Sequence, residues 1–173
     1  MSDQPKIFLG LGSNIDDRYY NLKSCMNYLD NHPHIWITDR SYIYQSKPMY
    51  YSFQDDYYNM VIKIETNLTP VELLMALKII ENKLGRIKIS KRNMPREIDI
   101  DILVYGDIEI DSKTLMLPHP CISERAFVLK PWNDIAPNFI IKKYSQTINQ
   151  MLNNIKNLKD VSMLLLDNGK GLL

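Results

Sequence analysis

A short alternating segment constrains the fold of this chain more than any other stretch. Along Ile98–Ile102, isoleucine and aspartate alternate in the sequence. A period of two is typical of a β-strand with one face in a hydrophobic core and the other face turned away from it. We therefore expect Asp99 and Asp101 to project together from one face. The side chains expected to pack inward are Ile98, Ile100, Ile102 and Val104.

The two carboxylates of this strand would lie close enough to repel each other. Because a strand residue advances about 3.3 Å, we expect the Cα atoms of Asp99 and Asp101 to be roughly 7 Å apart. A divalent cation removes the repulsion, and Mg²⁺ prefers one or two carboxylates, with phosphates and water as its other ligands. The alternative is a solvated sheet face on which lysines of a neighbouring strand neutralise the pair.

A basic segment directly before the strand favours phosphate binding. Polyphosphates are bound by metal ions together with guanidinium groups, so cations beside a metal-like pair suit a nucleoside triphosphate. A solvated loop and a nucleic-acid patch are the alternatives, although the net charge of +1 disfavours a general nucleic-acid binder. The cations of this segment are Arg86, Lys88, Lys91, Arg92 and Arg96.

The length and the apolar content indicate one domain without a membrane anchor. A chain of 173 residues can bury enough surface for an independent core. Cys25 and Cys121 form no C-x-x-C pair and are expected as ordinary thiols. The start of the chain lacks the apolar segment of a secretory signal, and no run approaches the ~18 apolar residues that a membrane span needs. We expect a cytoplasmic protein that binds neither membranes nor nucleic acid.

The hydrophobic periodicity predicts the order strand, helix, strand, strand, helix, strand. The second helix has the clearest start, because Thr69 is a good N-cap, Pro70 suits the first helical position and Glu72 can close a capping box. This order is that of a ferredoxin-like α+β domain, with an antiparallel sheet and helices packed on one face of it. The expected strands are 6–11, 34–45, 57–66 and 98–104, the expected helices are 18–31 and 70–84, and shorter elements are expected at 108–110, from 123 onward and at 144–155.

Several further features could belong to a site. The loop Ser46–Asp56 is too long for a tight hairpin and rich in aromatic residues, which is typical of functional loops. Tyr57 and Asn59 would share one strand face, offering a ring and an amide side by side. His119 lies between prolines in an extended backbone, although a lone histidine is more often structural than catalytic. Glu81 lies beside the apolar stripe of its helix, where either solvation or a role at the site would fit.

Six short motifs occur along the chain in the order in which one enzyme family carries them. The motifs are Gly12-Ser13-Asn14, Tyr57-Tyr58-Asn59, Gly85-Arg86, Pro95-Arg96-x-x-Asp99-Ile100-Asp101, Pro118-His119 and Arg125-Ala126-Phe127. The fourth motif is the most specific, because it places Pro-Arg and the alternating acidic strand behind a basic loop. On these motifs the chain resembles 6-hydroxymethyl-7,8-dihydropterin pyrophosphokinase of folate biosynthesis, from about residue 6 to residue 140.

The resemblance implies an ATP-dependent pyrophosphokinase, which moves pyrophosphate from ATP to the hydroxymethyl group of the dihydropterin and releases AMP. ATP would be the co-substrate, and two Mg²⁺ ions would be bound by Asp99 and Asp101. The catalytic residues implied are Arg86, Arg92, Arg96, Asp99 and Asp101. The pterin contacts implied are Ser46, Lys47, Pro48, Met49, Tyr57, Asn59 and Phe127. The nucleotide contacts implied are Glu81, Lys88, Arg96, Ile102, His119 and Arg125.

The resemblance also bears on the domain organisation. Residues 1–160 would form the pyrophosphokinase domain, and residues 161–173 a C-terminal tail that is either a last strand or a linker. The family also occurs fused to neighbouring folate-pathway enzymes. This chain differs from the family's common pattern at Asn93 and Met94, where an aromatic residue and a glycine are frequent, and at Lys47, where a proline is frequent.

Two rival functions belong to other classes. Gly12-Ser13 followed by Asp99-x-Asp101 loosely matches the G-S and D-x-D pattern of nucleotidyltransferases, but a long stretch with two expected strands separates the two parts. A ferredoxin-like RNA-binding module would stack bases on exposed rings of the sheet, although the sequence has no matching basic-aromatic motif. The rings in question are Tyr42, Tyr44, Tyr57 and Tyr58. Transfer of a nucleoside monophosphate would favour the first rival, and salt-dependent RNA affinity would favour the second.

Overall fold

The computed structural model describes residues 5–48, 54–85 and 95–164. A six-stranded sheet has the order β10-β3-β4-β1-β5, and β2 also pairs with β4. The pairings within this sheet are antiparallel, as expected for a ferredoxin-like arrangement. The strands are β1 (Ile7–Ser13), β2 (Ile35–Arg40), β3 (Tyr44–Ser46), β4 (Tyr57–Thr66), β5 (Asp99–Tyr105) and β10 (Val161–Met163).

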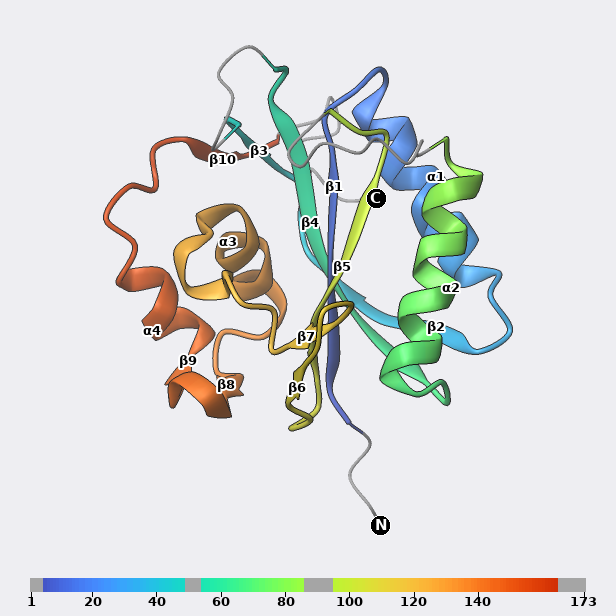
Figure 1. Ribbon diagram of the computed structural model, residues 1–173. Coiled ribbons are helices and arrows are strands. Elements are labelled where there is room, and N and C mark those ends of the chain that lie inside the picture. The colour runs from blue at the N-terminus through green and yellow to red at the C-terminus, as the bar shows by residue number, and fades with distance from the viewer. Residues whose placement is uncertain (1–4, 49–53, 86–94, 165–173) are drawn as a thin grey trace.

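Helices cover both faces of this sheet. Figure 1 shows α1 and α2 on one side of the strands and α3 and α4 on the other. Each side has its own hydrophobic core, and the core under α3 is centred on Trp132, whose ring lies 5.0 Å from that of Phe8. The α+β class and the antiparallel sheet are confirmed, whereas the expectation of helices on one face is incomplete. The helices are α1 (Arg18–Asp30), α2 (Pro70–Lys83), α3 (Ala126–Ile135) and α4 (Ile148–Asn153).

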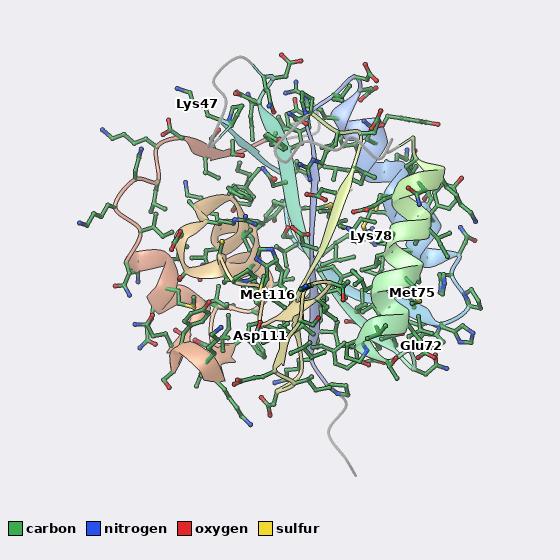
Figure 2. All side chains as sticks on the ribbon, viewed as in Figure 1. Lys47, Glu72, Met75, Lys78, Asp111 and Met116 are labelled. Atoms are coloured by element: carbon green, nitrogen blue, oxygen red, sulfur yellow. The ribbon has the colours of Figure 1, made fainter. Side chains whose placement is uncertain are left out.

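The start of α2 follows from local chemistry alone. The Glu72 side chain accepts a hydrogen bond from the Thr69 N–H at 2.8 Å, and the Glu72 N–H donates to the Thr69 hydroxyl, so the predicted capping box is present. Leu73 and Leu77 are fully buried against the sheet. Figure 2 shows Glu72, Met75 and Lys78 along the length of this helix. The helix thus presents one stripe to the core and holds the neighbouring strand β5 in place.

The alternation of the acidic strand ends at a β-bulge. The isoleucines of Ile98–Ile102 pack in the core under α1 and α2, as expected. The register with β1 then shifts, so that Phe8 pairs with Val104 and Leu103 is the extra residue on β5. Leu103 and Val104 both join the core under α3. The expectation that Val104 packs with the isoleucines is wrong, because the bulge reverses the alternation.

Two elements differ in extent from the sequence-based prediction. The expected strand 34–45 is divided into β2 and β3, because the Ser41 hydroxyl accepts a hydrogen bond from the Val61 N–H at 2.9 Å and thereby replaces a strand partner. The expected helix 144–155 is reduced to α4. Its N-cap is Thr147, which forms a capping box with Gln150. Ser145 has a φ of 51°, a left-handed conformation that cannot continue a helix.

The remaining elements are short. The short element expected at 108–110 is found two residues later as β6 (Ile110–Asp111), which pairs with β7 (Met116–Leu117). A second small ladder joins β8 (Ile140–Ile141) and β9 (Gln146–Thr147). Residues 161–163 of the expected tail form β10 at the edge of the main sheet. None of the helices in the described ranges combines the length and the apolar character that a membrane span requires.

Candidate active site

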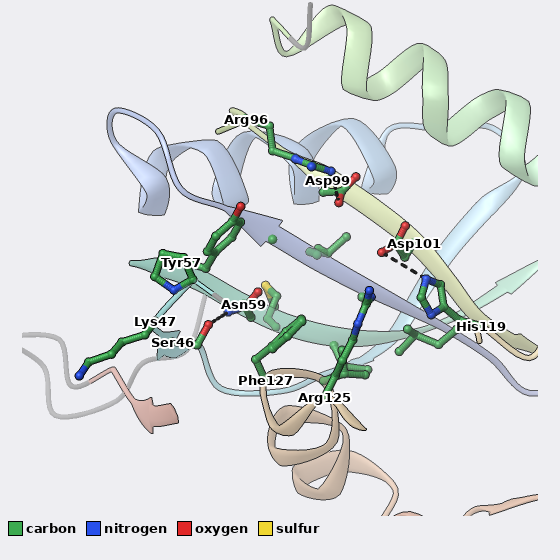
Figure 3. Close-up of a pocket in the computed structure, with 18 of the residues that line it drawn as sticks. Ser46, Lys47, Tyr57, Asn59, Arg96, Asp99, Asp101, His119, Arg125 and Phe127 are labelled. Atoms are coloured by element: carbon green, nitrogen blue, oxygen red, sulfur yellow. Dashed lines mark hydrogen bonds and ion pairs between the residues drawn. The ribbon is translucent and has the colours of Figure 1, made fainter. Parts of the chain in front are cut away.

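A pocket opens between the sheet and the start of α3. Its floor includes Gly10 and Gly12 of β1, and its walls come from β3, β4, β5 and α3. A Cβ atom at Gly12 would lie 3.2 Å from Oδ1 of Asn59, so glycine leaves this amide its place in the pocket. Figure 3 shows that the labelled side chains converge from several elements. The pocket is lined by Gly10, Leu11, Gly12, Ser46, Lys47, Pro48, Gln54, Tyr57, Asn59, Met60, Val61, Arg96, Asp99, Asp101, Leu103, His119, Arg125, Phe127 and Val128.

One end of the pocket carries the paired carboxylates. Asp99 Oδ2 lies 2.6 Å from Nη1 of Arg96, so its charge is balanced by a guanidinium. The backbone of Arg96 is itself anchored, because its N–H donates to Oδ1 of Asn14 at 2.9 Å and its carbonyl accepts from the Asn14 N–H at 3.2 Å. Asn14 directly follows β1. Arg96, which precedes the acidic strand β5, is therefore fixed by hydrogen bonds to the end of β1.

The charged form of Asp101 is disfavoured in the pocket. Desolvation, followed by the charge of Asp99, raises the pKa of Asp101 to about 6. His119 Nε2 lies 3.9 Å from Asp101 Oδ2, but desolvation and the charge of Arg125 lower the pKa of His119 to about 4. The imidazole is therefore neutral near pH 7 and does not neutralise the carboxylate. A site of this kind is stabilised by a bound cation.

The ring of His119 is oriented by the backbone around it. The backbone N–H of His119 donates to the Leu103 carbonyl at 2.8 Å, and this hydrogen bond attaches the segment around His119 to β5. Nδ1 accepts a hydrogen bond from the Cys121 N–H at 3.4 Å. A neutral imidazole that accepts at Nδ1 carries its proton on Nε2. The Nε2–H group consequently lies on the side of Asp101 and the pocket.

The available ligands suit magnesium better than a metal ion that takes all of its ligands from the protein. Across residues 5–48, 54–85 and 95–164, no three or more His, Cys, Asp or Glu side chains gather as a metal cluster. Mg²⁺ commonly takes only one or two carboxylates and completes its octahedron with water and phosphate. Asp99 and Asp101 on one strand face, with arginines beside them, fit that requirement.

The other end of the pocket carries rings and amides. Figure 3 shows the rings of Tyr57 and Phe127 on either side of the Asn59 side chain. Nδ2 of Asn59 donates to the Ser46 hydroxyl at 2.8 Å, and this pair is buried. The Tyr57 hydroxyl donates to Oε1 of Gln54 at 3.3 Å. This end offers flat apolar walls with a fixed amide between them.

Gln54 is a pocket residue that sequence reasoning missed. Besides accepting from Tyr57, its Oε1 accepts from Nδ2 of Asn14 at 3.1 Å, so it connects the two ends of the pocket. The only signal in the sequence was its position in the long aromatic loop Ser46–Asp56. A glutamine in a polar loop has no spacing or partner that marks it as part of a site.

Most of the implied site residues in the described ranges line the pocket. Arg86, Lys88, Arg92 and Met49 lie outside the described residues. Two others, Glu81 and Ile102, are absent from its lining. The implied residues that the structure brings together are Ser46, Lys47, Pro48, Tyr57, Asn59, Arg96, Asp99, Asp101, His119, Arg125 and Phe127.

Glu81 and Ile102 belong to the layer behind the pocket. Glu81 is 1% exposed, which contradicts the expectation of simple solvation. Its Oε1 accepts hydrogen bonds from the Ile100 N–H at 2.8 Å and from Nζ of Lys78 at 2.9 Å, so it joins α2 to β5. Ile102 packs in the core under α1 and α2. A direct nucleotide contact by either side chain has no support in this arrangement.

The pocket combines a carboxylate–arginine end with an aromatic–amide end on an antiparallel α+β fold. Residues 8–137 match the family model of 7,8-dihydro-6-hydroxymethylpterin-pyrophosphokinase. The chain belongs to this family, whose members are pyrophosphokinases. The resemblance seen in the sequence motifs is thereby confirmed.

Relatives of similar length share close to two fifths of their residues with this chain. The 2-amino-4-hydroxy-6-hydroxymethyldihydropteridine pyrophosphokinase of Methylorubrum extorquens is 40% identical over 136 residues, which cover 79% of this chain and 85% of the relative. The enzyme of the same name from Aquifex aeolicus is 38% identical over 144 residues, covering 83% of this chain and 88% of the relative.

Other relatives are much longer than this chain. The folic acid synthesis protein FOL1 of Dictyostelium discoideum is 42% identical over 151 residues, covering 87% of this chain but 22% of that protein. The chain spans about a fifth of the first three curated relatives that it matches. The Plasmodium falciparum HPPK-DHPS structure with pteroate superposes with a TM-score of 0.74 at 16% identity, over 96% of this chain and 47% of that one. At this identity the superposition shows the fold alone.

The two rival functions lose their structural basis. Ser13 is fully buried, and its hydroxyl accepts a hydrogen bond from Nδ2 of Asn21, so it is not presented to the acidic strand as in the nucleotidyltransferase pattern. Tyr44 is 7% exposed and is hydrogen-bonded to Asp134 of α3. An RNA-binding module needs an open sheet face, but α3 covers the face that would carry the stacked bases.

Proposed function

We propose that this chain transfers the β,γ-pyrophosphoryl group of ATP to the hydroxymethyl oxygen of 6-hydroxymethyl-7,8-dihydropterin. A bond forms between that oxygen and the β-phosphorus, and the bond from the β-phosphorus to the α,β-bridging oxygen breaks. AMP leaves with the bridging oxygen, and the hydroxyl proton is released. The observation that carries the proposal is a single pocket with a carboxylate–arginine end and an aromatic–amide end in a chain of the pyrophosphokinase family.

The charged end is proposed to hold the triphosphate. Asp99 and Asp101 would bind Mg²⁺, as two ions, which when present neutralises phosphate charge and makes the β-phosphorus more electrophilic. Arg96 and Arg125 line the same pocket and would neutralise the remaining charge. His119 would donate from Nε2–H to a phosphate oxygen. Arg86, Arg92 and Lys88 complete the proposed cation set from outside the described residues.

The flat end is proposed to hold the pterin. The rings of Tyr57 and Phe127 would stack on the two faces of the bicyclic ring, because flat apolar walls exclude water from it. Asn59 already donates to Ser46, and this leaves its carbonyl oxygen to accept from an N–H group of the pterin edge. Backbone groups of the segment Ser46–Met49 would bind the rest of that edge.

Positioning supplies most of the catalysis in this proposal. The acceptor hydroxyl must lie in line with the breaking bond at the β-phosphorus, and the slot and the charged end fix the two reactants relative to each other. No covalent intermediate with a side chain is required. The residues of the pocket bind, orient and exclude water, which is the competing acceptor.

The test is to identify the nucleotide product after incubation with ATP, Mg²⁺ and the dihydropterin. AMP matched by a pterin diphosphate is the expected result. ADP in stoichiometric amount would indicate an ordinary kinase, and pyrophosphate with an adenylylated acceptor would indicate a nucleotidyltransferase; either result overturns the proposal. Lys142→Met is a suitable control variant, because Lys142 is 68% exposed and its ammonium pairs with the surface residue Asp107.

The wider context of the reaction stays a prediction. Homologous sequences occur in longer folate-synthesis proteins, including the bifunctional protein FolKE of Lactococcus lactis. We propose that residues 1–160 carry the activity and that it takes place in the cytoplasm. The short strand β10 begins at Val161, directly after this proposed boundary, and pairs with β3 of the main sheet.

A further inference from the structure

The pterin end of the pocket is supported by a part of the chain that the family model does not reach. The family match ends at residue 137, whereas β10 comprises Val161–Met163. This strand pairs with β3, and Val161 lies opposite Ser46 in the ladder. The Lys47 N–H donates to the carbonyl of Asp160 at 3.2 Å. Without β10, the three-residue strand that carries Ser46 would be the unprotected edge of the sheet.

The same segment also supports the ring of Phe127. Val161 forms a small buried cluster with Tyr44 of β3 and Ala126 of α3. Phe127 packs against this cluster, and so does Leu158, which precedes the strand. The Ser46 edge of the proposed pterin slot and its Phe127 wall therefore both contact one short C-terminal segment.

Lys130 fastens this segment to α3. It lies one helical turn after Phe127, on the helix that carries the aromatic wall. Its Nζ donates to the carbonyl of Leu158 at 2.9 Å and to the carbonyl of Val161. A single ammonium group thus holds the two ends of the turn that leads into β10. Hydrogen bonds of this charge-assisted kind contribute more than neutral ones.

A second connection links α3 directly to β3. Asp134 accepts from the Tyr44 hydroxyl at 2.9 Å and from the Tyr42 N–H at 3.3 Å. This contact does not involve β10, so it joins α3 to β3 independently of that strand. The ion pair between Lys47 and Asp160, at 3.6 Å and mostly exposed, contributes little to holding β10. Figure 2 shows Lys47 at this outer edge of the molecule.

We propose that Lys130 is a positioning residue for the acceptor slot, acting through β10 on Ser46 and Phe127. The inference rests on the proposed function. Lys130 is not part of the pocket lining, and it fixes the slot by keeping β10 paired with β3 and packed on α3. The two carboxylates lie across the sheet from this segment, because β5 and β10 are the opposite edges of the sheet, with β3, β4 and β1 between them.

The test compares acceptor and nucleotide binding in the full chain by calorimetry. Lys130→Met keeps the aliphatic stem and removes the ammonium, and we expect the dissociation constant of the dihydropterin to rise about tenfold, as for loss of about 1.4 kcal/mol. The affinity for a non-hydrolysable Mg·ATP analogue should stay within about twofold. Lys130→Arg should restore most of the pterin affinity, and Lys142→Met should leave both ligands unaffected.

A readout without ligands tests the same idea separately. In Lys130→Met, the backbone amides of Tyr44–Lys47 should exchange with solvent faster than in the parent, while those of β5 keep the parent rate. If Lys130→Met does not fold, Val161→Ala replaces it, with Met163→Ala as its control, because Met163 lies on the same strand and is 39% exposed.

The outcomes distinguish this inference from the proposed function. Parent-like pterin affinity in a folded Lys130→Met variant overturns the positioning role, and so does an equal weakening of pterin and nucleotide. A parent chain that forms no AMP and binds no dihydropterin overturns the proposed function. Parent-like exchange of Tyr44–Lys47 in the variant would show, without reference to any ligand, that β10 does not depend on Lys130.

Discussion

The two ends of the pocket are built in different ways. The carboxylate end stands on β1 and β5, where consecutive contacts join Asn14, Arg96 and Asp99 within the family-matched range. The aromatic end stands at the sheet edge, where β4 and α3 meet β3 and are supported by β10 from beyond that range. Charge is therefore arranged by the alternation of one strand, whereas the shape of the slot depends on packing between distant segments.

Because the two ends are built differently, substitutions at each end should have different effects. A change at the carboxylate end alters charge in a frame that is already hydrogen-bonded, so it should affect chemistry more than folding. A change at the aromatic end alters a surface that depends on neighbours such as Val161, so it should affect acceptor binding first.

The largest effect is expected at the carboxylates. Asp99→Asn and Asp101→Asn should each lower kcat about a thousandfold or more, which corresponds to roughly 4 kcal/mol of transition-state stabilisation. Steady-state kinetics with saturating Mg²⁺ measures the loss, and urea unfolding checks that the fold persists. Near-normal turnover in either variant would refute the metal assignment and with it the distinct chemical role of this end.

A smaller and more selective effect is expected at the rings. Phe127→Ala and Tyr57→Ala should each weaken dihydropterin binding by roughly 1–3 kcal/mol, scaled from stacking of bases on aromatic side chains, with little change for ATP. Calorimetry with each ligand gives both affinities. An equal loss for the two ligands would mean that these rings serve the general fold and that the two ends are not independent.

The pH dependence of stability should sharpen the comparison. The pKa of Asp101 is about 6 in the folded chain, above its ordinary 3.8. Titration of this carboxyl therefore leaves the unfolding free energy highest below about pH 4 and lowers it as the pH rises through about 6. Asp101→Asn has no carboxyl to titrate at this position, so its unfolding free energy should not show this decrease. In chelator, its unfolding free energy should exceed that of the parent at pH 7.5 and match it near pH 4. A constant difference across this range would contradict the raised pKa of Asp101.

The smallest effect is expected behind the pocket. Glu81→Gln keeps an oxygen that can accept from the Ile100 N–H, so ATP affinity should change by less than about twofold. Glu81→Ala leaves that buried N–H without its acceptor and should lower the unfolding free energy by about 1–3 kcal/mol, again at nearly constant ATP affinity. A tenfold loss of ATP binding in Glu81→Gln would place this residue at the nucleotide.

The sequence allowed the carboxylate end to be predicted better than the aromatic end. The alternation at Ile98–Ile102 and the capping box at Thr69 are local patterns, and both correspond to observed elements. The reversal at Leu103 was not predictable, because a bulge depends on the register of β1 rather than on β5 itself. The place of Gln54 in the pocket and the support from Val161 depend on contacts between distant segments, which leave no periodic signal.

The second helical layer was missed for a related reason. The segment containing Trp132 has an internal proline, Pro131, and reads as a short helical stretch with no visible partner. Its partner is the face of the sheet that carries Phe8 and Val61, and this face becomes a core only when α3 and α4 cover it. Glu81 was also not predictable from its helix alone. This charged residue lies beside an apolar stripe and is buried because it accepts a hydrogen bond from the Ile100 N–H of a different element.

The support of β3 by β10 has a consequence for inhibitor selectivity. Compounds that occupy the triphosphate end would contact Arg96, Asp99 and Asp101, which lie within the range matched by the family model. A pterin-like compound extended past Ser46 toward Lys47 and Asp160 would contact a border that is partly built from residues beyond that range. Substituents directed there should therefore depend on the pairing of β10 with β3, whereas compounds confined to the triphosphate end should not.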